Sequence, residues 1–265
     1  TPIPRTLALM LYGDLQVSVL DELPPGRKQV ETYAVPPSYR PRLDAFIQKQ
    51  VQEGGQVYIV CPLIETEEGE DERQSAVAYA KALEQRIPQV SIGLMHGKLK
   101  SREKEQVMED FVQGKIQVLV STTVIEVGVN VPRASLMIVE DADRFGLSQL
   151  HQLRGRVGRG DRQSYCVLVS ASKSAKTQER LRVMTKCHDG FRIAEADLKL
   201  RGPGDFFGDR QHGLPEFRIA DLSQDVSLLQ AAQKAAQQML RQDPDLSSHP
   251  LLLEKVKQLF HRARQ

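Results

Sequence analysis

The segment SREKEQVMEDFVQGKIQVLVS, residues 101–121, combines one helix pattern with one strand pattern. Its first half places four apolar side chains at helical spacing, namely Val107, Met108, Phe111 and Val112. Ser101 is the expected amino-terminal cap of this helix, and Gly114 is the expected stop. The second half, Gln117–Ser121, is a short β-branched run typical of a buried strand. The segment therefore predicts one helix–strand unit of an α/β fold.

The same alternation extends in both directions along the chain. Further strands are expected at Val30–Val35, Val57–Leu63, Val90–Leu94, Leu136–Val139 and Tyr165–Val169. Between them, Pro41–Glu53 and Arg73–Arg86 are expected to be helices. Short strands that alternate with amphipathic helices are typical of βα units in a parallel sheet. We therefore expect one doubly wound parallel-sheet domain over residues 26–170.

The flanking regions have a different character. Residues 1–25 contain one strand pattern, Gln16–Leu20, followed by turn residues, and we assign them to the end of a preceding domain and a linker. Residues 171–225 are expected to hold two helices, Lys173–Asp189 and Ile193–Leu200, and then a glycine-rich loop. Two packing helices, Val226–Gln242 and Pro250–Arg264, are expected within residues 226–265. Because the chain opens at Thr1 without an initiator methionine, we expect it to be part of a longer polypeptide.

The composition excludes several classes of protein. Lys and Arg number 36 and Asp and Glu number 34, so the net charge does not indicate a nucleic-acid partner. Any nucleic acid must therefore be bound by a local basic patch. A hydrophobic share of 40% excludes collagen-like and wholly disordered chains. No apolar run approaches the roughly 18 residues that span a bilayer. We therefore expect no membrane association and a cytoplasmic protein. The three cysteines lack metal-ligand spacing, so we also expect no metal site.

The strongest chemical signal lies in QLRGRVGR, residues 152–159, which sets three arginines beside two glycines. Five arginines and one acid occur between Arg144 and Arg162. If this stretch is a helix, Gln152, Arg156 and Arg159 share one face. A fork of guanidiniums that can approach another surface closely suits a polyphosphate. The pattern therefore favours phosphate binding over a solvated basic helix.

A second candidate segment is STTVIEVGVNVP, residues 121–132. It places hydroxyl groups at the carboxyl end of the strand Gln117–Ser121, followed by a short helix. Ligands of α/β sheets bind at this position, where side-chain hydroxyls and backbone N–H groups can donate to a phosphate.

These segments resemble those of a known family. Residues 152–159 resemble motif VI (Q-x-x-G-R-x-G-R) of superfamily 2 helicases, residues 121–132 resemble motif V, and residues 57–63 with 96–111 resemble the motif IV region. Four further stretches are similar to segments of the RecG family of branched-DNA helicases: LYGD at 11–14, DELPPGRK at 21–28, RGPG at 201–204 and GDRQHG at 208–213. The resemblance runs along essentially the whole chain.

The resemblance implies a RecA-like second helicase lobe over residues 26–170. A translocation module over residues 171–225 would follow it, with a helical hairpin and a loop that grips duplex DNA. Arg156 and Arg159 would be catalytic and would reach the γ-phosphate of ATP. The nucleotide-binding residues implied by the family are Gly128, Asn130, Gln152, Arg156 and Arg159. Those implied for DNA binding and translocation are Thr122, Arg201, Gly204, Gly208, Gln211 and Gly213.

The chain contains neither a G-x-x-x-x-G-K-[ST] phosphate loop nor a D-E-x-[HQ] motif. The resemblance therefore implies that ATP and Mg are held by a first lobe outside this sequence, and that the chain alone is inactive. One implied partner is branched duplex DNA at stalled forks and Holliday junctions. The others are lobe 1 and a wedge domain of the same polypeptide. The resemblance also implies a monomer that acts in DNA repair and recombination. Two alternatives remain, a fragment of the transcription-repair coupling factor and a non-catalytic nucleic-acid-binding domain.

Overall fold

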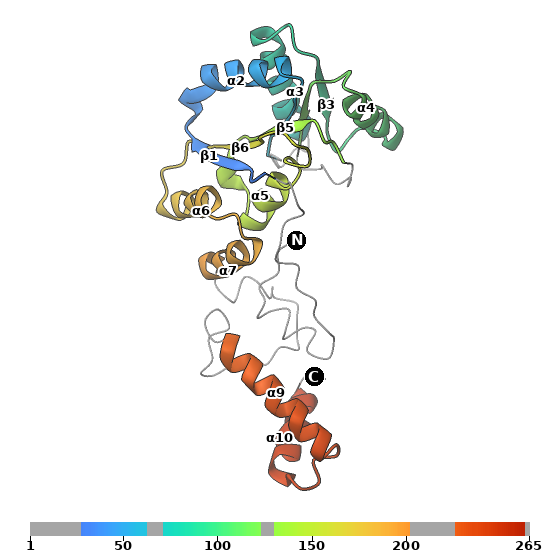
Figure 1. The fold of residues 1–265 in the computed structure, drawn as a ribbon, viewed down its shortest axis with the longest axis vertical. Helices are drawn as coiled ribbons and strands as arrows, with labels where there is room; N and C mark the ends of the chain where they lie inside the picture. The colour runs from blue at the N-terminus through green and yellow to red at the C-terminus, as the bar shows by residue number, and fades with distance from the viewer. Residues whose placement is uncertain (1–27, 63–70, 123–129, 202–225, 263–265) are drawn as a thin grey trace. The chain divides into compact units, whose positions relative to one another are not determined.

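The computed structural model describes residues 28–62, 71–122, 130–201 and 226–262 (Figure 1). They form two compact units whose boundary lies between Ile193 and Ala194. Among the sequence predictions, the strand Gln16–Leu20 and the residues Gly128, Gly204, Gly208, Gln211 and Gly213 lie outside the described residues.

The first unit is built on one parallel sheet of six strands in the order β1-β6-β5-β2-β4-β3. Their bounds are β1 (Glu31–Val35), β2 (Gln56–Val60), β3 (Ile92–Met95), β4 (Val118–Ser121), β5 (Ala134–Val139) and β6 (Tyr165–Val169). Every neighbouring pair is parallel. β2, β4 and β5 are buried along their whole length, as expected for strands covered on both faces. The α/β prediction is confirmed, and all six predicted strands of this lobe are present.

Helices cover both faces of this sheet. Figure 1 shows α2 (Arg40–Gln52) and α3 (Asp71–Arg86) on one face, and α5 (Leu147–Arg154) and α6 (Ala175–Lys186) on the other. Leu43 and Ile47 of α2 pack with Leu83 of α3 in one apolar cluster over the first face. Burial of this apolar surface is the main stabilising contribution to the lobe.

α4 (Ser101–Gln113) departs from the sequence prediction in two details. Its cap is Lys100 rather than Ser101, because the backbone of Lys100 is extended and its N–H donates to Glu103 Oε2 at 2.8 Å. The helix ends at Gly114 as predicted, where the backbone is left-handed with φ 83°. Phe111 packs on the ring of Tyr58 in β2 with centroids 4.8 Å apart, whereas Val112 remains exposed.

After β6, the chain continues into α6 and then α7 (Gly190–Arg201), close to the predicted hairpin helices. In the second unit, α9 (Val226–Gln242) begins and ends where the sequence predicts, and α10 spans Pro250–Arg262. Asp243 joins them: its carboxylate accepts hydrogen bonds from the backbone N–H groups of Ser247 and Ser248 and pairs with His249. Leu228 and Leu251 are exposed on these helices.

Candidate functional site

The arginine-rich segment is a loop and not the continuous helix that we inferred from its spacing. α5 ends at Arg154, and the next backbone bonds, Arg156 N–H to Leu153 O and Val157 N–H to Arg154 O, have the tighter three-residue spacing. Gly158 then takes φ 73°, which an α-helix cannot contain. Gln152, Arg156 and Arg159 therefore do not share a helical face. We call residues 155–163 the arginine loop.

The arginine loop packs closely against the start of several strands. A Cβ on Gly158 would lie 2.7 Å from Cγ2 of Val30, and a Cβ on Gly160 would lie 2.4 Å from the carbonyl oxygen of Pro132. Gln163 Nε2 donates to Gln29 O at 2.9 Å, and Arg162 donates to Glu53 O. Since these four partners precede β1, β2 and β5, the loop lies at the amino edge of the parallel sheet. The glycines are needed for this close approach to the loop's own lobe.

Arg156 is half-buried in this loop, and Arg159 and Gln152 are exposed. Arg159 Nε donates to Gly155 O at 3.3 Å. Tyr58 of β2 is only 2% exposed. Burial raises the pKa of Tyr58 to about 12, and the charges of Arg156 and Arg159 act in the opposite direction. Both arginines therefore act on Tyr58 electrostatically from the arginine loop.

Arg154, the first arginine of the motif, has no role that the sequence predicts. It is buried, and its Nη1 donates to the carbonyl oxygens of Met184 and Cys187, each at 2.9 Å. Its Nη2 lies 3.1 Å from Nδ1 of His151. Burial, followed by the charge of Arg154, lowers the pKa of His151 to about 4, so that a neutral imidazole accepts this hydrogen bond. Arg154 therefore joins α5 to the end of α6 and does not belong to an exposed fork.

Arg154 is the residue that sequence reasoning missed. Its partners are backbone carbonyls 30 and 33 residues away, which carry no side-chain signal in the sequence. The motif spacing alone assigns no role to Arg154.

The two ends of the candidate segment 121–132 lie at opposite edges of the sheet. Thr122 follows β4 at the carboxyl edge, where its N–H donates to Met95 O at 3.1 Å. It is 1% exposed, and its hydroxyl has no hydrogen-bond partner within the described residues. Asn130 is exposed and lies two residues before Pro132, against which Gly160 packs. The structure thus brings Asn130 to the edge that holds the arginine loop and leaves Thr122 at the other.

The predicted residue Arg201 is the last residue of α7. Over the described ranges, no group of three or more His, Cys, Asp or Glu side chains could hold a metal ion. None of the helices within those ranges is long and apolar enough to cross a membrane.

Two family models match the chain. The helicase conserved C-terminal domain matches residues 40–161, from α2 to the arginine loop, and the C-terminal part of domain 3 of the ATP-dependent DNA helicase RecG matches residues 187–263.

Individual relatives agree with these models. The ATP-dependent DNA helicase RecG of Synechocystis is 51% identical over 99% of this chain and 32% of its own length. The RecG helicase of Bacillus subtilis is 51% identical over 92% of this chain and 36% of its own length. A solved structure of RecG bound to a three-way DNA junction is 50% identical, with a TM-score of 0.69 over 86% of this chain and 29% of that one. The chain spans about a third of the length of these relatives. The resemblance seen in the motifs is thereby confirmed, and the chain belongs to the RecG family of helicases, as a part that carries the RecA-like carboxyl-terminal helicase lobe and the region that follows it.

Proposed function

We propose that the full-length protein hydrolyses ATP to move along branched duplex DNA and to remodel stalled forks and Holliday junctions, and that this chain supplies its second helicase lobe and its translocation module. The observation that carries the proposal is the arginine loop. It is packed onto the amino edge of the sheet through Gly158 and Gly160, and it offers Arg159 to solvent beside Arg156.

In this proposal, Arg156 and Arg159 act as arginine fingers on ATP held by the first lobe. Their planar guanidiniums can donate to the oxygens of the transferred γ-phosphoryl group and stabilise the negative charge that develops there. Gln152, Gly128 and Asn130 complete the nucleotide side. Mg would be held with ATP by the first lobe and would supply positive charge there.

The position of Arg154 supports coupling between this site and DNA movement. Its guanidinium joins the helix that leads into the arginine loop to the carbonyls at the end of α6, the first helix of the predicted hairpin. A displacement of α5 on lobe closure would therefore be transmitted to the hairpin. Beyond α7, we propose that Arg201 and Gln211 contact DNA phosphates and that Gly204, Gly208 and Gly213 shape the loop. Because Thr122 is buried at the carboxyl edge, we propose that it couples nucleic acid to the ATP site and does not contact DNA directly.

The remaining proposals concern the molecular context. The protein would work as a cytoplasmic monomer, with lobe 1 and a wedge domain in the same polypeptide. Its DNA contacts would be mostly to phosphates, because a translocating motor meets every base sequence in turn.

The test is DNA-stimulated ATP hydrolysis by the full-length protein with Arg156→Ala, Arg159→Ala or Arg159→Lys. We expect each alanine variant to lose about 10³- to 10⁵-fold in kcat, as arginine fingers do. The lysine variant should also be severely slow, because lysine keeps the charge but lacks the planar fork. Arg241→Ala, which removes an exposed arginine of α9, is the matched control and should be unaffected. Near-normal turnover of both alanine variants would contradict the proposal.

A further inference from the structure

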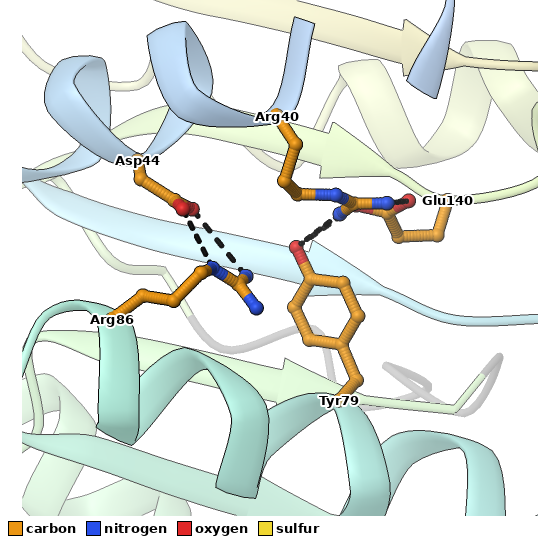
Figure 2. A network of polar contacts seen from close by, with 5 residues as sticks. All are labelled: Arg40, Asp44, Tyr79, Arg86 and Glu140. Carbon is orange, nitrogen blue, oxygen red and sulfur yellow. Dashed lines mark hydrogen bonds and ion pairs between the residues drawn. The ribbon is translucent and has the colours of Figure 1, made fainter. Parts of the chain in front are cut away.

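A buried ion pair holds the carboxyl end of β5. Glu140 directly follows β5, is 6% exposed, and receives both terminal nitrogens of Arg40 from the start of α2 (Figure 2). Arg40 Nη2 lies 2.8 Å from Glu140 Oε2. Tyr79 of α3 donates its hydroxyl to Glu140 Oε1 at 2.9 Å and accepts from Arg40 Nη1 at 2.8 Å. We call Arg40, Tyr79 and Glu140 the β5 clamp.

The β5 clamp is directional. A bidentate arginine–carboxylate pair fixes the carboxylate in both position and plane. Burial and the nearby Glu140 carboxylate raise the pKa of Tyr79 far above its ordinary value, so its phenol remains a donor. The clamp therefore fixes the orientation of the Glu140 side chain. Apolar packing alone is non-directional and would fix this orientation less well.

The backbone beyond Glu140 is strained and is held on its other side too. Asp141 has φ 43°, a left-handed conformation that is unfavourable for residues with a Cβ and persists where the surroundings hold it. Two residues later, in the short 3-10 helix η2 (Ala142–Arg144), Asp143 O accepts from Arg180 of α6 at 2.6 Å. Asp143 Oδ1 also accepts from Ser170 Oγ at 2.6 Å. The turn is thus held by the clamp before it and by α6 and Ser170 after it.

This turn sets the direction in which α5 crosses the lobe. α5 has eight residues and leads from the carboxyl edge to the arginine loop at the amino edge. Eight residues span about 12 Å, so a tilt of only about 5° at the start displaces the far end by about 1 Å. Displacements of that size in a catalytic group can lower turnover by up to about 10²-fold.

We propose that Glu140 is a positioning residue for Arg156 and Arg159: clamped by Arg40 and Tyr79, it fixes the turn from which α5 carries the arginine loop. The inference rests on the proposed ATP-hydrolysing function of the full-length protein. Glu140 lies at the opposite edge of the sheet from the arginine loop and acts only through the backbone that joins them.

A second ion pair in Figure 2 provides a matched control. Arg86 of α3 donates to Asp44 of α2, with Nε 2.6 Å from Oδ2 and Nη2 3.4 Å from Oδ1. It bridges the same two helices as the clamp, but neither residue contacts β5 in the described hydrogen bonds. Asp44→Asn therefore weakens the α2–α3 contact while leaving Glu140 in place.

The experiment compares Glu140→Gln, Arg40→Lys and Asp44→Asn in the full-length protein, at a temperature well below the lowest unfolding midpoint. For Glu140→Gln we expect kcat of DNA-stimulated ATP hydrolysis to fall roughly 10- to 100-fold with KM for ATP little changed. Affinity for ADP should stay the same, whereas affinity for ADP with aluminium fluoride, a transition-state mimic, should fall by a similar factor. Arg40→Lys keeps the charge but loses the bidentate contact, so we expect smaller changes in the same direction. This variant tests the inference if Glu140→Gln does not fold. Asp44→Asn should keep kcat.

Normal kcat in Glu140→Gln or in Arg40→Lys would overturn the inference. It would also be overturned if kcat fell in both Glu140→Gln and Asp44→Asn, in proportion to the thermal stability that each variant loses. A failure of the proposed function gives a different result, because then the unmodified protein shows no DNA-stimulated hydrolysis or Arg156→Ala retains it.

Discussion

At the amino edge of the sheet, Arg159 is exposed and Arg156 is half-buried, whereas on the face covered by α2 and α3, Arg40 and Arg86 are each paired with a carboxylate of the same lobe. Arg154 belongs to neither group, since it is buried and donates to backbone carbonyls. Arginines with satisfied internal partners contribute to the architecture of the lobe. For Arg156 and Arg159, at the glycine-packed edge, contact with a ligand remains our proposal. The burial of Arg154 and its carbonyl partners, more than its place in the motif, thus indicate its role.

The largest effect should come from studying this chain without the first lobe that we propose holds ATP. We expect the purified 265-residue chain to hydrolyse no ATP with or without forked DNA, because its sequence holds no phosphate loop and no D-E-x-[HQ] motif. A phosphate-release assay beside the full-length protein measures this. DNA-stimulated turnover in the chain that disappears in its Arg159→Ala variant would contradict the prediction, since a contaminating enzyme would not respond to that change.

A second prediction sharpens the contrast between Arg154 and Arg159, which lie five residues apart. Arg154→Met should lower the free energy of unfolding of the lobe by about 2–4 kcal/mol, because it leaves the carbonyls of Met184 and Cys187 without their donor. Arg159→Ala should change it by no more than about 0.5 kcal/mol, as for an ordinary surface residue. Urea denaturation of both variants tests the pair. Equal losses would mean that the two arginines are structurally equivalent after all.

The fold was more predictable than the site, and the reason is the range of the interactions involved. Strands such as Tyr165–Val169 and the end of α4 at Gly114 follow from local runs and local backbone preference. The arginine loop could not be predicted in the same way, because Gly158 leaves the helical conformation where it meets Val30, far away in the sequence. The β5 clamp was missed for a related reason, since Glu140 lies 100 residues from Arg40 and 61 from Tyr79.

A third prediction concerns the glycines that hold the arginine loop against the amino edge. Gly158→Ala should destabilise the lobe by about 1–3 kcal/mol, because φ 73° is unfavourable for alanine and its Cβ would lie 2.7 Å from Val30. Gly155→Ala is the control: its φ is −68° and its closest contact, Gln152 O, lies at 3.3 Å, so the change should be within about 0.5 kcal/mol. Thermal unfolding measures both. If Gly155→Ala proved the more harmful of the two, the loop would not be held as described.

The smallest expected effect is a pH dependence at the contact between His151 and Arg154. The pKa of His151 falls from 6.5 to about 4 in the folded lobe, first through burial and then through the charge of Arg154, while Asp189 acts weakly in the opposite direction. The unfolded chain therefore binds a proton at His151 below pH 6.5, whereas the folded lobe does not until about pH 4. The stabilising contribution of the neutral imidazole is fully present above pH 6.5 and is lost as pH falls through this window.

Because His151 is partly exposed, we expect the free energy of unfolding to change by about 1–2 kcal/mol, less than the full pKa shift would give. Denaturation curves between pH 4.5 and 7.5 measure the slope, and His151→Gln, which keeps an acceptor for Arg154 but does not titrate, should flatten it. An unchanged slope in His151→Gln would assign the acid sensitivity of the lobe to other groups.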